Sequence, residues 1–239
     1  FFFKQKTAYE ISTRDWSSDV CSSDLTQYKC PTHRTILPSF KHLMPIGDSA
    51  PAILFERLGG SAIIRFNKPE IRNPLGSETV RMLIDLMRRI ESDGGISKTI
   101  FTGRDSVFAS GADIREIAEL SPEDAPAFGN LGQKLMVSIS KSSKPTIAAV
   151  NGFCFGGGLD LTISCSRRFA SPSATFCHPG AGLGIITGWG GTQRLPRLIG
   201  SAAAIEMFMT GKVVDANEAL RIGLIEAIAE DPLARALEC

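Results

Sequence analysis

The run GGGLD at residues 156–160 constrains the fold of this chain more than any other feature. It follows the apolar stretch 146–150 and the turn Asn151-Gly152, so it predicts a strand that passes into a helix through backbone without side chains. The first N–H groups of such a helix have no partner inside it and suit an oxygen that gains negative charge. Asp160, the first acid of the helix, is then close enough to a bound substrate to move a proton.

A second loop of the same kind supports this functional interpretation. Residues 108–114, FASGADI, follow the apolar strand 99–101 and a turn at 103–105, and they predict a strand, a loop of small residues and a helix start. Either loop alone is also explained by close packing of glycines or by an acid that favours a helix N-terminus. Two such loops from neighbouring crossovers can each offer one backbone N–H to the same oxygen, as an oxyanion hole requires.

Four ordered motifs resemble those of the crotonase superfamily, the enoyl-CoA hydratases and isomerases. They are NKPEIRN at 67–73, FASGAD at 108–113, KPTIAAVNGFCFGGGLD at 144–160 and GGTQRLPR at 190–197. The resemblance extends from about Ala52 to the C-terminus. It implies an α/β fold in which ββα units form a right-handed spiral, and an enzyme that acts on acyl-CoA thioesters.

The resemblance also implies roles for particular residues. The amides of Ala112 and Gly157 would hold the thioester oxygen, and Asp160 would occupy the position of the first catalytic carboxylate. The remaining candidate substrate-binding residues are Arg72, Ser110, Gly111, Asp113, Gly156 and Gly180. The coenzyme A thioester is the substrate, and we expect neither a metal nor a further cofactor.

One departure from the family pattern bears directly on the reaction. Family hydratases have a second glutamate in a segment resembling F-x-x-P-E, whereas residues 174–180 of this chain read ATFCHPG, so Gly180 replaces the acid. Losing one carboxylate should slow hydration by about 10²–10⁴, and isomerisation, which moves one proton within an allylic system, by less. Asp160 is also one methylene shorter than the glutamate of the hydratases.

Three substitutes for the second acid stay open: water, an anion such as the bicarbonate of naphthoate-forming members, and His178. The pKa of an unperturbed histidine lies near neutrality, and if the strand continues, His178 shares a face with Gly180. A structural histidine is the simpler explanation. The alternative function is a catalytically impaired acyl-CoA-binding protein or structural subunit.

Hydrophobic periodicity predicts the other elements. Strands are expected at 53–58 and 62–66, joined by Gly59-Gly60, and again at 98–102 and 145–150. Helices are expected from Ser77 to Gly94, over about 113–141, at 157–165 and from 189 onward. The core face of the first helix would hold Val80, Leu83, Ile84, Met87 and Ile90.

Composition restricts the class of protein. Of 239 residues 43% are hydrophobic and 21% charged, with a net charge of +1, which is typical of a globular enzyme and gives no indication of a nucleic-acid partner. The sequence has no apolar run long enough for a membrane span. Six scattered cysteines lack zinc-site spacing and are expected as reduced thiols in a cytoplasmic protein.

The ends of the chain are expected to differ from its middle. Residues 1–25 resemble a translated sequencing adapter and are treated as a non-native leader, and residues 26–51 are an irregular lead-in. Residues 52–239 form the acyl-CoA domain, incomplete at its C-terminus, because family members continue through helices that build homotrimers or hexamers. Arg194 and Arg197 either attract CoA phosphates or face solvent.

Overall fold

The computed structural model describes residues 50–239, so the predictions for the leader and for most of the lead-in lie outside the described residues. The strands are β1 (Ile53–Leu58), β2 (Ser61–Phe66), β3 (Pro74–Leu75), β4 (Lys98–Thr102), β5 (Val107–Ala109), β6 (Gly111–Ala112), β7 (Thr146–Val150), β8 (Phe153–Phe155), β9 (Arg167–Ala170), β10 (Thr175–Cys177), β11 (Val214–Asp215) and β12 (Ala227–Ile228). The helices are the 3-10 turn η2 (Pro69–Ile71) and α2 (Ser77–Ser92), α3 (Ile114–Glu119), α4 (Ala125–Ser140), α5 (Gly157–Thr162), α6 (Gly180–Leu183), α7 (Gly191–Ile199), α8 (Ser201–Thr210), α9 (Ala216–Arg221) and α10 (Pro232–Leu237).

The strands form a spiral of ββα units. In each unit a strand of the six-stranded sheet, ordered β1-β2-β4-β7-β9-β12, is followed by a strand of the four-stranded sheet, ordered β11-β10-β8-β5. The pairs β4 then β5, β7 then β8, and β9 then β10 advance by one position in both sheets, and each pair is followed by a helix. All pairings of the large sheet are parallel except that of β1 with β2. The predicted α/β spiral is therefore confirmed.

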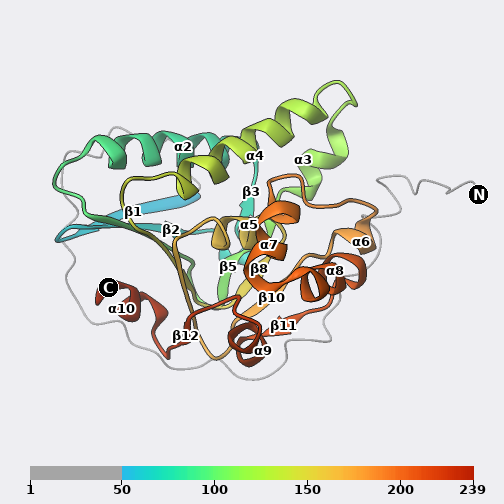
Figure 1. Cartoon of the computed structure of the whole chain (residues 1–239). Helices are drawn as coiled ribbons and strands as arrows, with labels where there is room; N and C mark the ends of the chain where they lie inside the picture. The colour runs from blue at the N-terminus through green and yellow to red at the C-terminus, as the bar shows by residue number, and fades with distance from the viewer. Residues whose placement is uncertain (1–49) are drawn as a thin grey trace, which may run out of the picture. The chain divides into compact units, whose positions relative to one another are not determined.

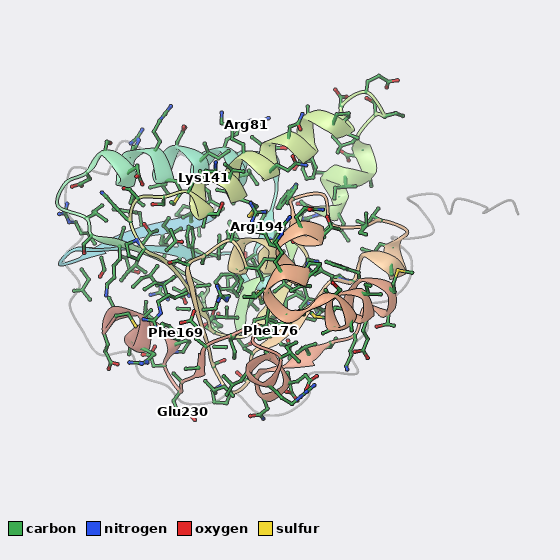
Figure 2. All side chains as sticks on the ribbon, viewed as in Figure 1. Arg81, Lys141, Phe169, Phe176, Arg194 and Glu230 are labelled. Atoms are coloured by element: carbon green, nitrogen blue, oxygen red, sulfur yellow. The ribbon has the colours of Figure 1, made fainter. Side chains whose placement is uncertain are left out.

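The central parallel strands are buried on both faces. Successive residues of β7 alternate between two apolar clusters: Ala148 and Val150 pack with α2 and α4, whereas Ile147 and Ala149 pack with α10. Figure 1 shows α2 and α4 on one side of the sheet and α10 on the other. Phe169 and Phe176, labelled in Figure 2, belong to different clusters. This two-sided burial explains why the strands read as unbroken apolar runs.

The turns between the two sheets are tied to one another through Asn151. Its side chain accepts a hydrogen bond from Gly103 N at 2.9 Å and donates one to Asp105 O at 2.7 Å. One amide side chain thus satisfies backbone groups in the preceding unit of the spiral. These bonds join neighbouring units of the spiral at the turns that lead into β5 and β8.

Most predicted elements are confirmed, with four corrections. Gly76, not Ser77, is the N-cap of α2. On the core face of this helix Leu86 is buried, whereas Ile84, which was expected there, is only half-buried. The helical region expected over 113–141 consists of two helices, α3 and α4, interrupted at 120–124. The glycine-led helix α5 ends at Thr162 rather than Cys165.

Four of the six cysteines lie in the described part of the chain, and all four are free thiols, three buried and Cys239 exposed. None of the described helices combines the length and apolar character that crossing a membrane requires.

Asn73 holds the segment before α2 against β5. Its backbone has a positive φ of 49°, its Oδ1 accepts from Lys68 N at 2.6 Å, and its Nδ2 donates to Val107 O and Phe108 O at 3.1 and 2.9 Å. The side chain is buried. Because asparagine tolerates the left-handed region better than most residues, this position suits both its backbone and its amide.

We predict that Asn73→Ala lowers the free energy of unfolding by about 2–3 kcal/mol, because buried backbone groups lose their partners. Asn217→Ala, at an exposed position of α9, is the control and should change stability by no more than about 0.5 kcal/mol. Urea denaturation of the three proteins measures both values. Equal stability of the two variants would contradict the role assigned to Asn73.

Candidate active site

The two glycine-containing loops meet at Gly111 and Gly157. Gly111 has a φ of +94°, and a Cβ there would overlap the backbone N of Gly157. A Cβ on Gly157 would lie 3.2 Å from Ala112 N and 2.5 Å from the Trp189 ring. The amides of Ala112 and Gly157 are therefore neighbours because neither glycine carries a side chain.

The start of α5 requires glycine for two further reasons. Gly156 has a φ of +51°, where a side chain is strained. A Cβ on Gly158 would overlap Ala109 O. The close-packing interpretation of the three glycines is confirmed, and this packing is also what places the first turn of α5 against the loop that contains Ala112.

Asp160 lies one turn into α5 with only 1% of its surface exposed. Its Oδ2 accepts a hydrogen bond from the Thr187 hydroxyl, whereas its Oδ1 has no hydrogen-bond partner in the part of the chain that the structure describes. Burial raises the pKa of the carboxyl to about 7, against the opposing effects of the Thr187 hydrogen bond and the Arg194 charge. A group with a pKa near neutrality can both accept and return a proton.

His178 lies beside Asp160. The strand face that the sequence predicts it to share with Gly180 does not exist. β10 ends at Cys177 and Gly180 begins α6, so His178 and Gly180 do not share a strand face. The His178 Nε2 lies 3.5 Å from Asp160 Oδ1, and both side chains are buried. Burial lowers the pKa of His178 to about 4, so the imidazole is neutral at pH 7.

Asp160 and His178 line a cavity of about 280 Å³. The walls are largely apolar, and they include four predicted site residues besides Asp160 and Ala112: Ser110, Gly156, Gly157 and Gly180. Apolar side chains from α3, α4, α8 and the segment 183–189 complete the walls: Ile114, Ile117, Leu120, Phe128, Leu183, Ile185, Ile186, Trp189 and Phe208. The cavity suits an apolar group attached to a polar reacting centre.

Three predicted substrate-binding residues lie outside the cavity lining. Gly111 lies against the backbone of Gly157. Asp113 caps α3, and its carboxylate pairs with Arg115 at 2.9 Å, which lowers the pKa of Asp113. Arg72 is exposed, its guanidinium lies 5.1 Å from the centre of the Phe153 ring, and its carbonyl accepts from Ser110 N at 2.8 Å. The backbone at Arg72 is thus tied to the loop that carries Ala112.

The two arginines of α7 have different surroundings. Arg194, labelled in Figure 2, is half-buried, donates to Trp189 O at 3.2 Å and lies close enough to Asp160 to stabilise its carboxylate. Arg197 is exposed. Arg194 therefore belongs to the surroundings of Asp160, whereas Arg197 faces solvent.

An anion as the substitute for the second acid stays a prediction, but it would not lie where a side chain at position 180 would project. A Cβ on Gly180 would lie 2.5 Å from Ile185 O, and Ile185 N donates to Gly180 O at 3.0 Å. The main chain of Ile185 fills the place into which a side chain at position 180 would project. Glycine is required here by the return of the chain after α6.

Sequence reasoning missed Thr187, and it did not assign Trp189 to the site. Thr187 has no distinguishing motif, and only the fold brings its hydroxyl to Asp160. Trp189 is 4% exposed and packs against Gly157 and Phe128, with ring centres of the two aromatic residues 5.7 Å apart. A tryptophan directly before the glycines that open α7 was the available signal.

Comparison with known proteins gives a consistent result. A family model described as enoyl-CoA hydratase/isomerase matches residues 56–236. The short-chain-enoyl-CoA hydratase of Clostridium acetobutylicum is 40% identical over 179 residues, which cover 74% of this chain and 69% of that protein. The crotonyl-CoA hydratase of Syntrophomonas wolfei is 41% identical with the same coverage. The structure of an enoyl-CoA hydratase from Bacillus anthracis superposes with a TM-score of 0.75 at 31% identity, covering 79% of this chain and 74% of that one.

We predict that Gly180→Glu lowers the free energy of unfolding by about 1–3 kcal/mol and does not add a second carboxylate to the cavity, because the new side chain collides with Ile185. The matched control is Gly182→Glu, since a Cβ at Gly182 meets no described atom within 4 Å. Thermal and urea denaturation compare the two. A Gly180 variant as stable as its control would show that the segment 180–185 adapts to a side chain.

We also predict how stability depends on pH. The folded-state pKa of Asp160, about 7, exceeds its ordinary value of 3.8, so the folded protein keeps a proton that the unfolded chain has lost between these values. Stability therefore falls as pH rises through this window, and Asp160→Asn removes that loss. From pH 4 to pH 8 the variant should gain on the order of 2–4 kcal/mol relative to wild type.

The measurement is urea unfolding of both proteins across this pH range, with the exposed Glu230→Gln as the control for removing a surface carboxylate. His178 is present in both proteins, and its own contribution, which is lost as pH falls from 6.5 towards 4, enters the difference only as far as its pKa depends on Asp160. A difference that does not change with pH would contradict the raised pKa of Asp160.

Proposed function

Because this chain belongs to the enoyl-CoA hydratase/isomerase family, we propose that it binds the acyl group of an enoyl-CoA thioester in the cavity and moves a proton next to the thioester carbonyl. The amides of Ala112 and Gly157 hold the thioester oxygen. Asp160 accepts and returns the proton. The substrate is the CoA thioester itself, and these proton transfers need no redox cofactor.

The carboxyl of Asp160 is the observation that carries this proposal. It is buried in the cavity wall, one of its oxygens lacks a partner among the described residues, and its pKa is about 7. A permanently ionised surface carboxylate would be a poor acid, and a fully neutral one a poor base. The free oxygen and the near-neutral pKa are the properties expected of a proton carrier.

The neighbouring amides supply the second requirement. Removing a proton beside a thioester places negative charge on the carbonyl oxygen, and that charge must be stabilised as it develops. Gly157 is the first residue of α5, so its N–H has no partner inside the helix. Ala112 N lies 3.2 Å from the position of a Cβ on Gly157, close enough for both amides to share one oxygen.

A catalytically impaired acyl-CoA binder is the second candidate, favoured by one observation. Among the described residues that line the cavity, Asp160 is the only carboxylate. Hydration with one carboxylate lacks the usual second group, whereas isomerisation of a 3-enoyl thioester needs one base that also returns the proton. The two candidates differ in turnover and not in binding.

The test uses crotonyl-CoA and a 3-enoyl-CoA, followed by the loss or gain of conjugated enone absorbance. We predict that Asp160→Asn lowers kcat by about 10²–10⁴, whereas the affinity for a CoA thioester, measured by calorimetry, is retained. Glu230→Gln, at the exposed position labelled in Figure 2, exchanges a carboxylate for an amide outside the cavity and should retain full activity.

Each other outcome has a defined meaning. Full activity of the Asp160 variant refutes the role of this residue. Binding of both thioesters by the wild-type protein without turnover favours the impaired binder.

A further inference from the structure

We propose that His178 is a second proton carrier of this site and works together with Asp160 on the same substrate. The inference rests on the proposed function and extends it, since it assigns the role of the missing acid to an imidazole. It also determines which reaction the site can perform. With two proton carriers the cavity can hydrate a double bond as well as move it.

His178 lies in the cavity wall beside Asp160. The residue follows β10 directly, is 4% exposed and lines the same cavity as Asp160 and Ala112. Its ring packs against Phe208 on α8, with the ring centres 5.0 Å apart. The imidazole is thus held by packing, with its Nε2 directed to the carboxyl of Asp160.

The facing atoms of His178 and Asp160 have no hydrogen-bond partner among the described residues. Buried side-chain polar atoms in native proteins normally form hydrogen bonds, and each exception calls for an explanation. Within residues 50–239, the buried side-chain atoms without a partner are His178 Nε2, Asp160 Oδ1 and Thr99 Oγ1. The first two face each other at 3.5 Å. One proton between them would satisfy both, and such contacts commonly shorten when substrate binds.

The groups around Asp160 and His178 set the charge of this pair. Arg194 on α7 favours the carboxylate, and the buried thiol of Cys154 on β8, whose pKa burial raises strongly, contributes no charge at pH 7. Cys177, which precedes His178, is likewise a neutral thiol, with a pKa raised to about 11. The pair therefore holds one proton or none near neutrality and changes its net charge by one unit.

The proposed hydration step balances in protons and electrons. One O–H bond of water breaks as its oxygen bonds to the β-carbon, the proton goes to Asp160, and the C=C electron pair moves to the thioester oxygen. The proton passes from Asp160 Oδ1 to His178 Nε2, and His178 donates it to the α-carbon as the enolate collapses. The pair ends with the number of protons with which it began.

If His178 were purely structural, its replacement would have different effects. Such a residue would fill space against Phe208, and replacing it would lower stability or weaken binding without changing proton transfer. His178→Gln distinguishes the two roles, because a glutamine amide can donate a hydrogen bond to Asp160 but cannot carry a proton at neutral pH. The measured quantities are kcat, KM and the pH profile on crotonyl-CoA and a 3-enoyl-CoA.

We expect His178→Gln to lower kcat for hydration of crotonyl-CoA by about 100-fold or more, with KM little changed and with a smaller loss on the 3-enoyl-CoA. The acid and base limbs of the profile of kcat against pH should also shift along the pH axis. Thr99→Val removes the third unpartnered buried atom, outside the cavity lining, and should leave both rates unchanged. Equal rates for wild type and His178→Gln on every thioester that the wild type converts would overturn the proposal.

A second measurement tests the pair without any turnover. The chain has three histidines, His33, His42 and His178, so ¹⁵N spectra of histidine-labelled protein contain few ring signals, and the one lost in His178→Gln identifies His178. We expect its ring nitrogen signals to stay those of a neutral imidazole well below pH 6 and to shift on Asp160→Asn. A signal that titrates near 6.5 and ignores Asp160→Asn would overturn the proposal.

The two measurements separate the failure of this inference from failure of the proposed function. If the wild-type protein converts neither thioester, the proposed function fails, and the ¹⁵N result alone decides whether Asp160 and His178 share a proton. If turnover is present and the His178 variant keeps it, the proposed function stands and the second carrier is refuted.

Discussion

The site depends on the direct contact between the backbones at Gly111 and Gly157. This contact joins two consecutive units of the spiral at the point where each passes from strand to helix, and it leaves no room for a side chain on either residue. Trp189 closes the other side of Gly157. The amides of Ala112 and Gly157 are neighbours for this reason alone. A single added methyl group would separate the loops and move apart the two amides that we propose as oxyanion donors.

Burial of Asp160 costs the protein stability at the residue that we propose as the proton carrier. Removing a carboxyl from water penalises its charged form, and among the described residues the Thr187 hydroxyl and the charge of Arg194 oppose that penalty. The same burial produces the near-neutral pKa that proton transfer requires. Buried groups with shifted pKa values are typical of functional sites, because the rest of the fold is stable enough to offset what they cost.

Gly180 is interpreted differently from the sequence and from the structure. In the sequence motif it stands where a second carboxylate is absent. In the folded protein it is a position where the returning main chain of Ile185 excludes any side chain. The candidate for the role of the second acid is therefore not position 180 but the neighbouring His178. This residue lies in the turn between β10 and α6 rather than in a strand.

The sequence by itself determined the strand-to-helix units, the glycine loops and the identity of Asp160 as the first acid of α5, because these follow from local periodicity and from what glycine permits. It also indicated the spiral, through the resemblance of four ordered motifs. The packing of the folded chain was needed to show that Thr187 reaches Asp160, that the charge of Arg194 acts on this carboxyl, and that Asp160 Oδ1 faces His178 Nε2. These pairs join residues of different elements, and their distances depend on how helices and loops pack, which no local pattern encodes.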